Sequence, residues 1–268
     1  MHTALSVVTV VKDDIPGLTR TRDSLAGCAP EDLHRIEWVV VDSSADAEAV
    51  SRIVAESSLD GKTHWVAPAG VYEAMNTAID IAQGEYIYFL NAGDRLHRPQ
   101  ALTALVATIS REAPVWFYGQ VAFTDHDGAE VIPPRFDYRA AKRAHFSSGR
   151  FPPHQGTVVR RDTLRSIGGF DTSYRITADY TAMLHFSLLA DPKELDEVVA
   201  DFDTGGISEQ RWLLAINEFH RARLEVMQPR GWDLVREFTR TGDLALRTAL
   251  HRARTRIRAH TSRAQRLP

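Results

Sequence analysis

The sequence has a single cysteine, Cys28, among 268 residues. One thiol forms no disulfide within the chain and supplies no cysteine cluster for a metal. No apolar run approaches the roughly 20 residues that span a bilayer. The N-terminus lacks the basic start and apolar middle of a signal peptide, so we expect a cytoplasmic protein.

Two glycine-rich nucleotide motifs are also missing. The sequence contains neither G-x-G-x-x-G nor G-x-x-x-x-G-K-[ST], which argues against a nicotinamide enzyme and a P-loop nucleotidase. The turn after the first apolar segment instead holds Lys12, Asp13 and Asp14. Two carboxylates there would repel a diphosphate, so a nucleotide diphosphate bound nearby would need a metal cation.

What is present is an ordinary globular composition with an uneven charge. Apolar residues make up 44% and charged residues 25%, which excludes disordered and collagen-like chains. The net charge is −3, but residues 236–268 hold nine arginines against Glu237 and Asp243. This tail therefore carries +7 and the rest of the chain −10.

Leucines alternate with the arginines of this tail, as in helices that lie on anionic membrane surfaces. We therefore expect a partner at the inner face of the cell membrane as one alternative. A homodimer contact, a solvated helix face and a frayed terminus are the others. No aromatic platform accompanies the arginines, so we do not expect nucleic acid.

Apolar strands and periodic helices alternate over the first hundred residues. The pattern predicts strands over 4–11, 36–41, 63–66 and 85–90 and helices over 14–27, 46–57, 71–83 and 98–112. Short connections between them favour a parallel α/β sheet. The later segments are less regular: strands over 115–124, 156–160 and 197–202, helices over 162–167 and 177–190, a long loop over 132–153, and helices from about 209, broken near 229–231.

Two acidic residues follow predicted strands, Asp42 after the second and Asp94 after the fourth. Ligands of open parallel sheets bind outside the carboxyl ends of the strands. A carboxylate there can accept from a ribose hydroxyl or a base N–H, and Asp94 is a natural ligand for magnesium or manganese. The alternative is that each aspartate caps a turn or a helix.

Seven motifs in order resemble those of family 2 glycosyltransferases, and most closely the bacterial branch that makes colanic acid and related surface glycans. The similarity covers roughly residues 4–210. The motifs are residues 5–10 with Asp42, then 70–76, 89–94, 153–155, 167–171, 178–180 and 205–208.

The resemblance implies a GT-A type α/β fold, a Rossmann-like and mostly parallel sheet flanked by helices. Residues 1–208 would form this domain, with a nucleotide-binding half over about 1–97 and an acceptor half over about 98–208. Residues 209–268 would form a helical extension with the basic tail. The implied reaction is an inverting transfer from a nucleotide-diphosphate sugar to a hydroxyl of a glycan or a lipid-linked acceptor.

The resemblance also assigns roles to residues. Asp179, at the start of a predicted helix, matches the catalytic base, which takes the proton of the acceptor hydroxyl. A divalent metal, Mn or Mg, would be held by Asp94 and His154. The donor-binding residues would be Thr9, Asp42, Asn76, Asn91, Asp94, His154, Gly205 and Gly206. For Asn76 the leading alternative is a structural role. Asn91 replaces the first carboxylate of the family's D-x-D motif, and Gln120 stands where the family often has aspartate.

Two other functions stay open at this point. A sugar nucleotidyltransferase would need a glycine-rich basic loop after the first strand, which residues 12–14 do not provide. A catalytically degenerate binder of nucleotide sugars is compatible with Asn91 in the metal motif. The strand aromatics are expected in the core, namely Trp38, Tyr86, Tyr88, Phe89, Trp116 and Phe117.

Overall fold

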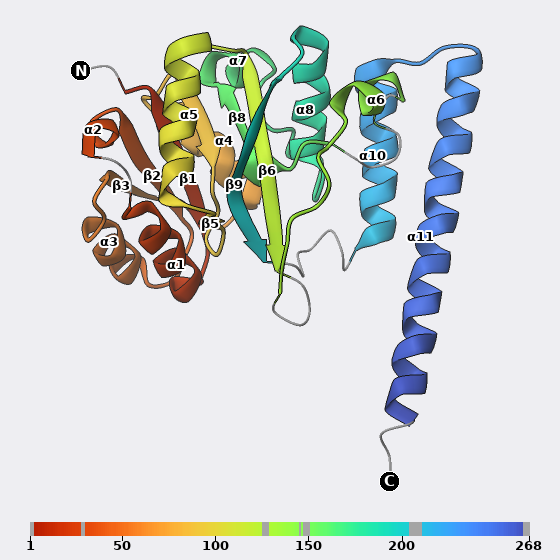
Figure 1. Ribbon diagram of the computed structural model, residues 1–268, viewed down its shortest axis with the longest axis horizontal. Helices are drawn as coiled ribbons and strands as arrows, with labels where there is room; N and C mark the ends of the chain where they lie inside the picture. The colour runs from red at the N-terminus through yellow and green to blue at the C-terminus, as the bar shows by residue number, and fades with distance from the viewer. Residues whose placement is uncertain are drawn as a thin grey trace.

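The computed structural model describes residues 3–27, 30–124, 129–144, 146, 151–203 and 211–264. Within these residues, nine strands form one sheet with helices on both faces (Figure 1). The strands are β1 (Leu5–Val11), β2 (Ile36–Asp42), β3 (Asp60–Trp65), β4 (Tyr86–Phe89), β5 (Arg95–Leu96), β6 (Trp116–Thr124), β7 (Glu130–Val131), β8 (Thr157–Arg160) and β9 (Lys193–Asp203). The helices are α1 (Ile15–Leu25), α2 (Pro30–Leu33), α3 (Ala47–Ala55), α4 (Val71–Ile81), α5 (Pro99–Glu112), α6 (Tyr138–Arg143), the 3₁₀ turn η1 (His154–Gly156), α7 (Arg161–Ser166), α8 (Ala178–Leu189), α10 (Trp212–Met227) and α11 (Trp232–Ala264).

The first four strands form the predicted parallel half of the sheet. Their order is β3-β2-β1-β4, and every neighbouring pair is parallel. Parallel neighbours require crossovers, which α1, α3 and α4 supply. The carboxyl ends of these strands therefore meet at one edge, where the arrowheads of β6 and β9 also point in Figure 1.

The second half of the sheet is mixed. Strand β8 pairs antiparallel with both β4 and β6, β9 runs parallel to β6, and β5 pairs antiparallel with β9. Strand β7 pairs antiparallel with β6 outside the main strand order. The α/β fold class is thus confirmed, with parallel pairing concentrated in the first four strands.

Two apolar clusters fill the two faces of the sheet. One joins β1, β2 and β4 to α1, α3 and α5, and the other joins the opposite side chains to α4, α8 and the second half of α10. Because buried strands have apolar residues on both faces, their sequences read as nearly continuous apolar runs. The six strand aromatics expected in the core are all buried.

Five short elements were not predicted, namely α2, β5, β7, α6 and η1. Helix α6 lies inside the segment 132–153 that we expected to be a loop. Its start is capped by Asp137, whose Oδ1 accepts from the Ala140 N–H over 2.8 Å. A helix of six residues is too short to show a periodic apolar face.

The C-terminal helices are present and are broken at residues 228–231 as expected. Helix α10 packs on α8, and the first half of α11 packs on α10, while the second half extends beyond the body (Figure 1). The division of the chain at residue 208 stays a prediction. Among the described residues no helix has the length and apolarity to cross a bilayer.

Candidate functional site

A cleft of about 590 Å³ opens at the carboxyl edge of the parallel strands. Its lining comes from the end of β1, the start of α1, the residue after β2, the start of α4 and the turn after β4. Lys12, Ser43, Gly70 and Asn91 are among the lining residues. Helix α4 begins at Gly70 without a side-chain cap, so its first N–H groups are available to an anion.

The turn after β4 presents one unsatisfied polar atom. Asn91 Oδ1 is buried and has no hydrogen-bond partner, although Asn91 lines the cleft. The turn is closed by the Asp94 N–H, which donates to the Asn91 carbonyl over 3.0 Å. Gly93 between them has φ +98°, a conformation that favours glycine. A buried carbonyl oxygen without a donor favours a ligand at this point.

Asp94 lies next to this turn and is only 7% exposed. Its backbone carbonyl accepts from Thr21 Oγ1 over 2.8 Å, which ties the turn to α1. Burial raises the pKa of Tyr88, and the negative charges of Asp94 and Asp201 add to that increase. The Asp94 carboxylate therefore lies near Tyr88, whose hydroxyl donates to the Gln155 carbonyl over 2.8 Å.

Asp42 and Thr9 are both enclosed by the protein. Asp42 is 1% exposed, and its Oδ1 accepts from the Ser44 N–H over 2.7 Å, so it shapes the turn whose Ser43 lines the cleft. The Thr9 hydroxyl donates to the Leu90 carbonyl and accepts from Trp38 Nε1. Thr9 is fully buried and is not among the residues that line the cleft, so its role as a donor contact stays a prediction.

Asp179 stands in the first turn of α8, half-buried beside Tyr72. The Tyr72 hydroxyl lies 3.1 Å from Asp179 Oδ1 and 2.6 Å from the carbonyl of Ile176. Burial, followed by the negative charge of Asp179, raises the pKa of Tyr72, so this phenol keeps its proton. The first turn of a helix stabilises the charged carboxylate.

His154 lies between the turn after β4 and Asp179. Its ring stacks on Phe89 at 5.3 Å and meets the edge of Phe170 at 5.9 Å. Burial lowers the pKa of His154, while the Asp179 charge opposes this effect. The imidazole is therefore neutral near pH 7, and its Nε2 is buried without a hydrogen-bond partner.

Asn76 holds the loop that carries Phe170. Its Nδ2 donates to the Phe170 carbonyl, and its Oδ1 accepts from the Phe170 N–H, each over 2.8 Å. Both polar groups are thus used inside the protein, as the structural alternative for Asn76 expects, and a donor contact of Asn76 stays a prediction. Its effect on the site passes through Phe170, which packs against Tyr72 and Phe89. Gly205 and Gly206 lie outside the described residues.

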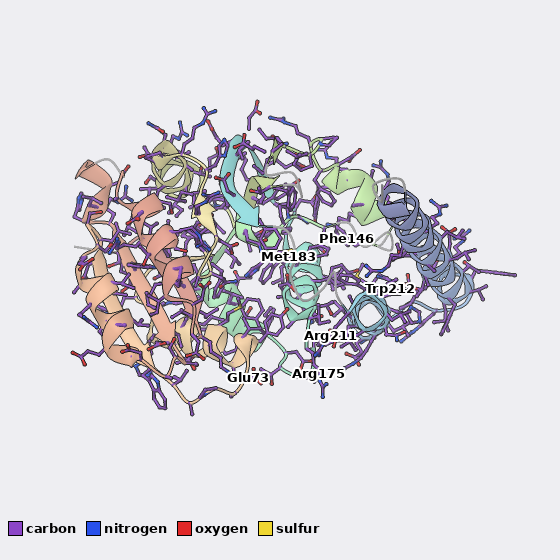
Figure 2. All side chains as sticks on the ribbon, turned by 90° about the horizontal axis from the view of Figure 1, so that it is seen from below. Glu73, Phe146, Arg175, Met183, Arg211 and Trp212 are labelled. Carbon is purple, nitrogen blue, oxygen red and sulfur yellow. The ribbon has the colours of Figure 1, made fainter. Side chains whose placement is uncertain are left out.

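Sequence reasoning missed Glu218, which positions the start of α8. This side chain of α10 is buried, and its two oxygens accept from the N–H groups of Arg175, Ile176 and Thr177 over 2.9–3.1 Å. Thr177 itself provides no side-chain cap. Arg175 lines a hollow together with Asn217 and Glu218 of α10, and Figure 2 shows its label close to that of Arg211, the residue before this helix. No local pattern could reveal a capping residue that is 41 positions away.

Comparisons with known proteins agree with this arrangement. The family model described as glycosyl transferase family 2 matches residues 6–168. An uncharacterized glycosyltransferase of Mycobacterium tuberculosis is 28% identical over 212 residues, which cover 77% of this chain and 78% of the relative.

Two solved structures share the fold. Staphylococcus aureus TarS in complex with UDP-GlcNAc superposes with a TM-score of 0.65 and 16% identity, over 83% of this chain and 65% of that one. The mannosyltransferase PcManGT of Pyrobaculum calidifontis, in complex with GDP-Man and Mn²⁺, superposes with a TM-score of 0.62 and 14% identity, over 99% of this chain and 81% of that one.

Proposed function

The chain belongs to glycosyl transferase family 2 and is a glycosyltransferase of GT-A fold, and from this premise we propose the reaction that it performs. The donor is a nucleotide-diphosphate sugar, and the acceptor is a hydroxyl of a glycan or a lipid-linked glycan. The transfer inverts the anomeric carbon and serves the synthesis of surface polysaccharide or glycolipid.

The contact chain from Asp179 to Asn91 carries this proposal. Asp179 is close enough to His154 for its charge to oppose the lowering of the His154 pKa. His154 stacks on Phe89, the last residue of β4, and Asn91 follows two positions later. These neighbours support a site in which a carboxylate and an open amide oxygen would flank one region at the sheet edge, as a transfer between two substrates requires.

The donor would lie in the cleft beside Ser43, Gly70 and Asn91. Asp42 would act by shaping the turn that receives the base and ribose. A divalent cation, Mn or Mg, would be held at the Asn91–Asp94 turn. The Asn91 amide oxygen, which has no hydrogen-bond partner, and the Asp94 carboxylate are oxygen ligands of the kind these ions take. The cation supplies neutralisation of the charge on the departing diphosphate. Nε2 of His154 is a further open ligand atom.

Asp179 would act as the general base. The acceptor oxygen forms a bond to the anomeric carbon from one face, while the bond from that carbon to the diphosphate oxygen breaks on the other. The hydroxyl proton passes to the Asp179 carboxylate, and the bonding electron pair leaves with the nucleoside diphosphate. Tyr72 holds the carboxylate in place for this step.

A thermal-shift panel tests the donor assignment. UDP, GDP, dTDP and CDP are each added with and without Mn²⁺, and one nucleotide should raise Tm through linked binding. The variants Asn91→Ala and Asp94→Ala should lose the part of the shift that depends on Mn²⁺. An unchanged Mn²⁺-dependent shift in both variants would remove this turn from the cation site.

We also propose that α11 holds the enzyme at an anionic membrane surface, where a lipid-linked acceptor would be found. Trp232, Val235, Leu246 and Leu250 are between 49% and 80% exposed. Their spacings of 3, 11 and 4 residues put them on one helix face, opposite the buried Glu237 that contacts α10. Arg236 and Arg247 flank this stripe with exposed side chains.

Sedimentation with lipid vesicles tests this proposal. The protein should pellet with vesicles of phosphatidylglycerol and not with phosphatidylcholine, and added salt should weaken the binding. Leu246→Glu combined with Leu250→Glu should abolish pelleting, whereas Leu189→Glu, at an equally exposed leucine of α8, should not. Pelleting that survives the double substitution, or a dimer that depends on these two leucines, would refute it.

A further inference from the structure

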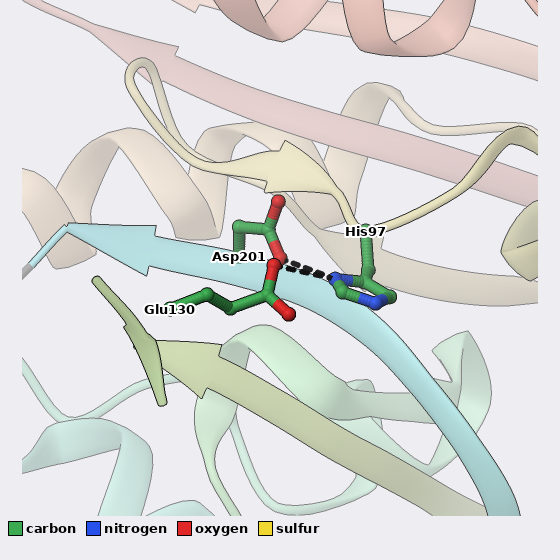
Figure 3. A group of neighbouring side chains, drawn as sticks. All are labelled: His97, Glu130 and Asp201. Atoms are coloured by element: carbon green, nitrogen blue, oxygen red, sulfur yellow. Dashed lines mark hydrogen bonds and ion pairs between the residues drawn. The ribbon is translucent and has the colours of Figure 1, made fainter. Parts of the chain in front are cut away.

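Three side chains that the proposed reaction does not use converge near the end of β9. His97 follows β5, Asp201 belongs to β9, and Glu130 belongs to β7. Nδ1 of His97 lies 2.6 Å from Asp201 Oδ1 and 3.9 Å from Glu130 Oε2. Figure 3 shows the two carboxylates on the same side of the imidazole. One nitrogen and two oxygen atoms thus lie within 4.8 Å of one another.

The strand register explains why these distant residues meet. Asp201 pairs with Ala122 of β6, and Glu130 pairs with Thr124, two positions further along the same strand. Residues paired across strands share a face, and alternate residues of one strand do too. Glu130 therefore shares a face with Asp201, and the small Ala122 between them leaves room for the glutamate side chain. The His97 N–H donates to the Val199 carbonyl, which sets the histidine beside β9.

The charges of this group favour a cation. Asp201 and His97 have side-chain exposures of only 16% and 8%, and Glu130 bends toward them although it is 58% exposed. Two carboxylates repel each other at this range unless a positive charge lies between them. The guanidinium of Arg95 is 3.9 Å from the outer oxygen of Asp201, at the limit of an ion pair, and is itself partly exposed.

We propose that His97, Asp201 and Glu130 bind a divalent transition metal, with Zn²⁺ as the best fit. Imidazole and carboxylate bind zinc at about 2.0–2.2 Å, so tetrahedral ligand atoms lie about 3.3 Å apart. The two nitrogen–oxygen distances of 2.6 and 3.9 Å lie on either side of this value, so side-chain shifts below 1 Å would bring both of them to it. Mg²⁺ is disfavoured because it prefers oxygen ligands.

The proton balance of binding is simple. The ionised Asp201 carboxylate only accepts, so Nδ1 of His97 donates in the metal-free hydrogen bond. On metal binding this proton leaves Nδ1, and the neutral ring carries its proton on Nε2 instead. The metal then joins β5, β7 and β9 through one centre. Because Asp94 is the residue immediately before β5, the centre would brace the turn that carries Asn91 and Asp94.

Calorimetric titration of the metal-free full chain with Zn²⁺ tests the site, with Co²⁺ absorption as a second readout of tetrahedral nitrogen and oxygen ligands. The tightest Zn²⁺ site should hold one ion per chain, and Mg²⁺ should not compete for it. His97→Gln and Glu130→Gln should each weaken Zn²⁺ binding by at least about 100-fold, more than the roughly 10–100-fold loss for a group that only orients a ligand. Glu130 is exposed, so its substitution leaves folding intact.

Two control variants separate this site from other metal binding. His64→Gln removes an exposed histidine of β3 and should leave Zn²⁺ affinity unchanged. Asp94→Asn should also leave it unchanged, because Asp94 belongs to the turn proposed for the donor cation. Equal Zn²⁺ affinity in wild type, His97→Gln and Glu130→Gln, or no Zn²⁺ binding by the folded wild type, would overturn the proposal.

Discussion

The hydroxyl of Tyr72 on α4 lies 3.1 Å from Oδ1 of Asp179 on α8 and 2.6 Å from the carbonyl of Ile176. One phenol thus joins the helix that lines the cleft to the helix that carries the proposed base. The phenol keeps its proton because burial and the Asp179 charge both raise its pKa. Tyr72 is accordingly a positioning residue for Asp179.

Substitution of Tyr72 by Phe should lower kcat about tenfold with little change in KM for the donor. A hydrogen bond to a charged group contributes about 1.5–3 kcal/mol, and about 1.4 kcal/mol is a tenfold change in rate. The ring contact with Phe170 at 5.8 Å should survive. Steady-state kinetics with varied donor measure both constants.

Tyr174→Phe is the matched control, because it removes a similar hydrogen bond from a buried tyrosine to Glu225, over 2.6 Å. It should leave kcat unchanged. Equal losses of kcat in the two variants would mean that Tyr72 acts only through stability.

Glu218→Gln should destabilise the protein and reduce kcat together. The substitution replaces one accepting carboxylate oxygen by an amide NH₂ group. This group donates and so cannot accept from the N–H groups of residues 175–177. Leaving buried donors unsatisfied costs about 1–3 kcal/mol. Asp179 is two residues after Thr177, the last of these three, so the position of its carboxylate should also change. Urea unfolding and kcat at saturating donor measure the two effects.

Glu225→Gln provides the comparison on the same helix, since this exposed carboxylate contacts Arg221 and Tyr174 and not the start of α8. Its kcat should equal that of wild type. A Glu218→Gln enzyme with full kcat would remove Glu218 from the positioning of Asp179.

The stability of the protein should fall as the pH drops below about 6.5, in part because of His154. Burial lowers the pKa of His154 below its ordinary 6.5, so between the two pKa values the unfolded chain binds a proton that the folded chain does not. The free energy of unfolding therefore rises with pH across this window and levels off above it. The pKa of His185 is lowered by burial in the same direction.

His154→Gln should reduce the slope of unfolding free energy against pH. Urea unfolding between about pH 5 and pH 7.5 measures this slope. His64→Gln, at an exposed position, should keep the wild-type slope. A His154→Gln slope identical to that of wild type would contradict the burial of a neutral imidazole.

Gly169→Ala should destabilise the protein more than Gly168→Ala. Both glycines have positive φ, +77° and +83°, and an alanine in this region costs about 1–2 kcal/mol. A Cβ at Gly169 would lie 2.5 Å from Asn76 Oδ1, whereas one at Gly168 would meet open space. The contact should add about 1–2 kcal/mol, as overpacking does. Equal unfolding free energies for the two variants would show that the Asn76 bridge to Phe170 yields without cost.

Local patterns were sufficient for the long elements of this fold. Strands β1, β2 and β4 are apolar on both faces, and α1 and α3 begin at capping aspartates, Asp14 and Asp46. Strands β5 and β7 have two residues each, too few for any alternation. They exist because β9 and β6 offer free edges, which is a property of the folded sheet.

The candidate site was predictable where function depends on position along one element. Asn91 follows a strand, and Asp179 starts a helix, so both could be assigned from the sequence. Thr9 and Asn76 also fall within the motifs, but their hydrogen bonds are made with groups that only the fold brings near. Glu218 and the group of His97, Glu130 and Asp201 depend wholly on such distant contacts.

The most direct test compares wild type with Asp179→Asn in two measurements on the nucleotide sugar identified by the thermal-shift panel. Asparagine keeps the size of the side chain and the Tyr72 contact but cannot take the acceptor proton. We predict that the variant binds the donor within about twofold of the wild-type Kd, whereas transfer to the acceptor falls by at least about 100-fold, as expected for loss of a general base. A folded Asp179→Asn enzyme that transfers sugar at the wild-type rate would contradict the account.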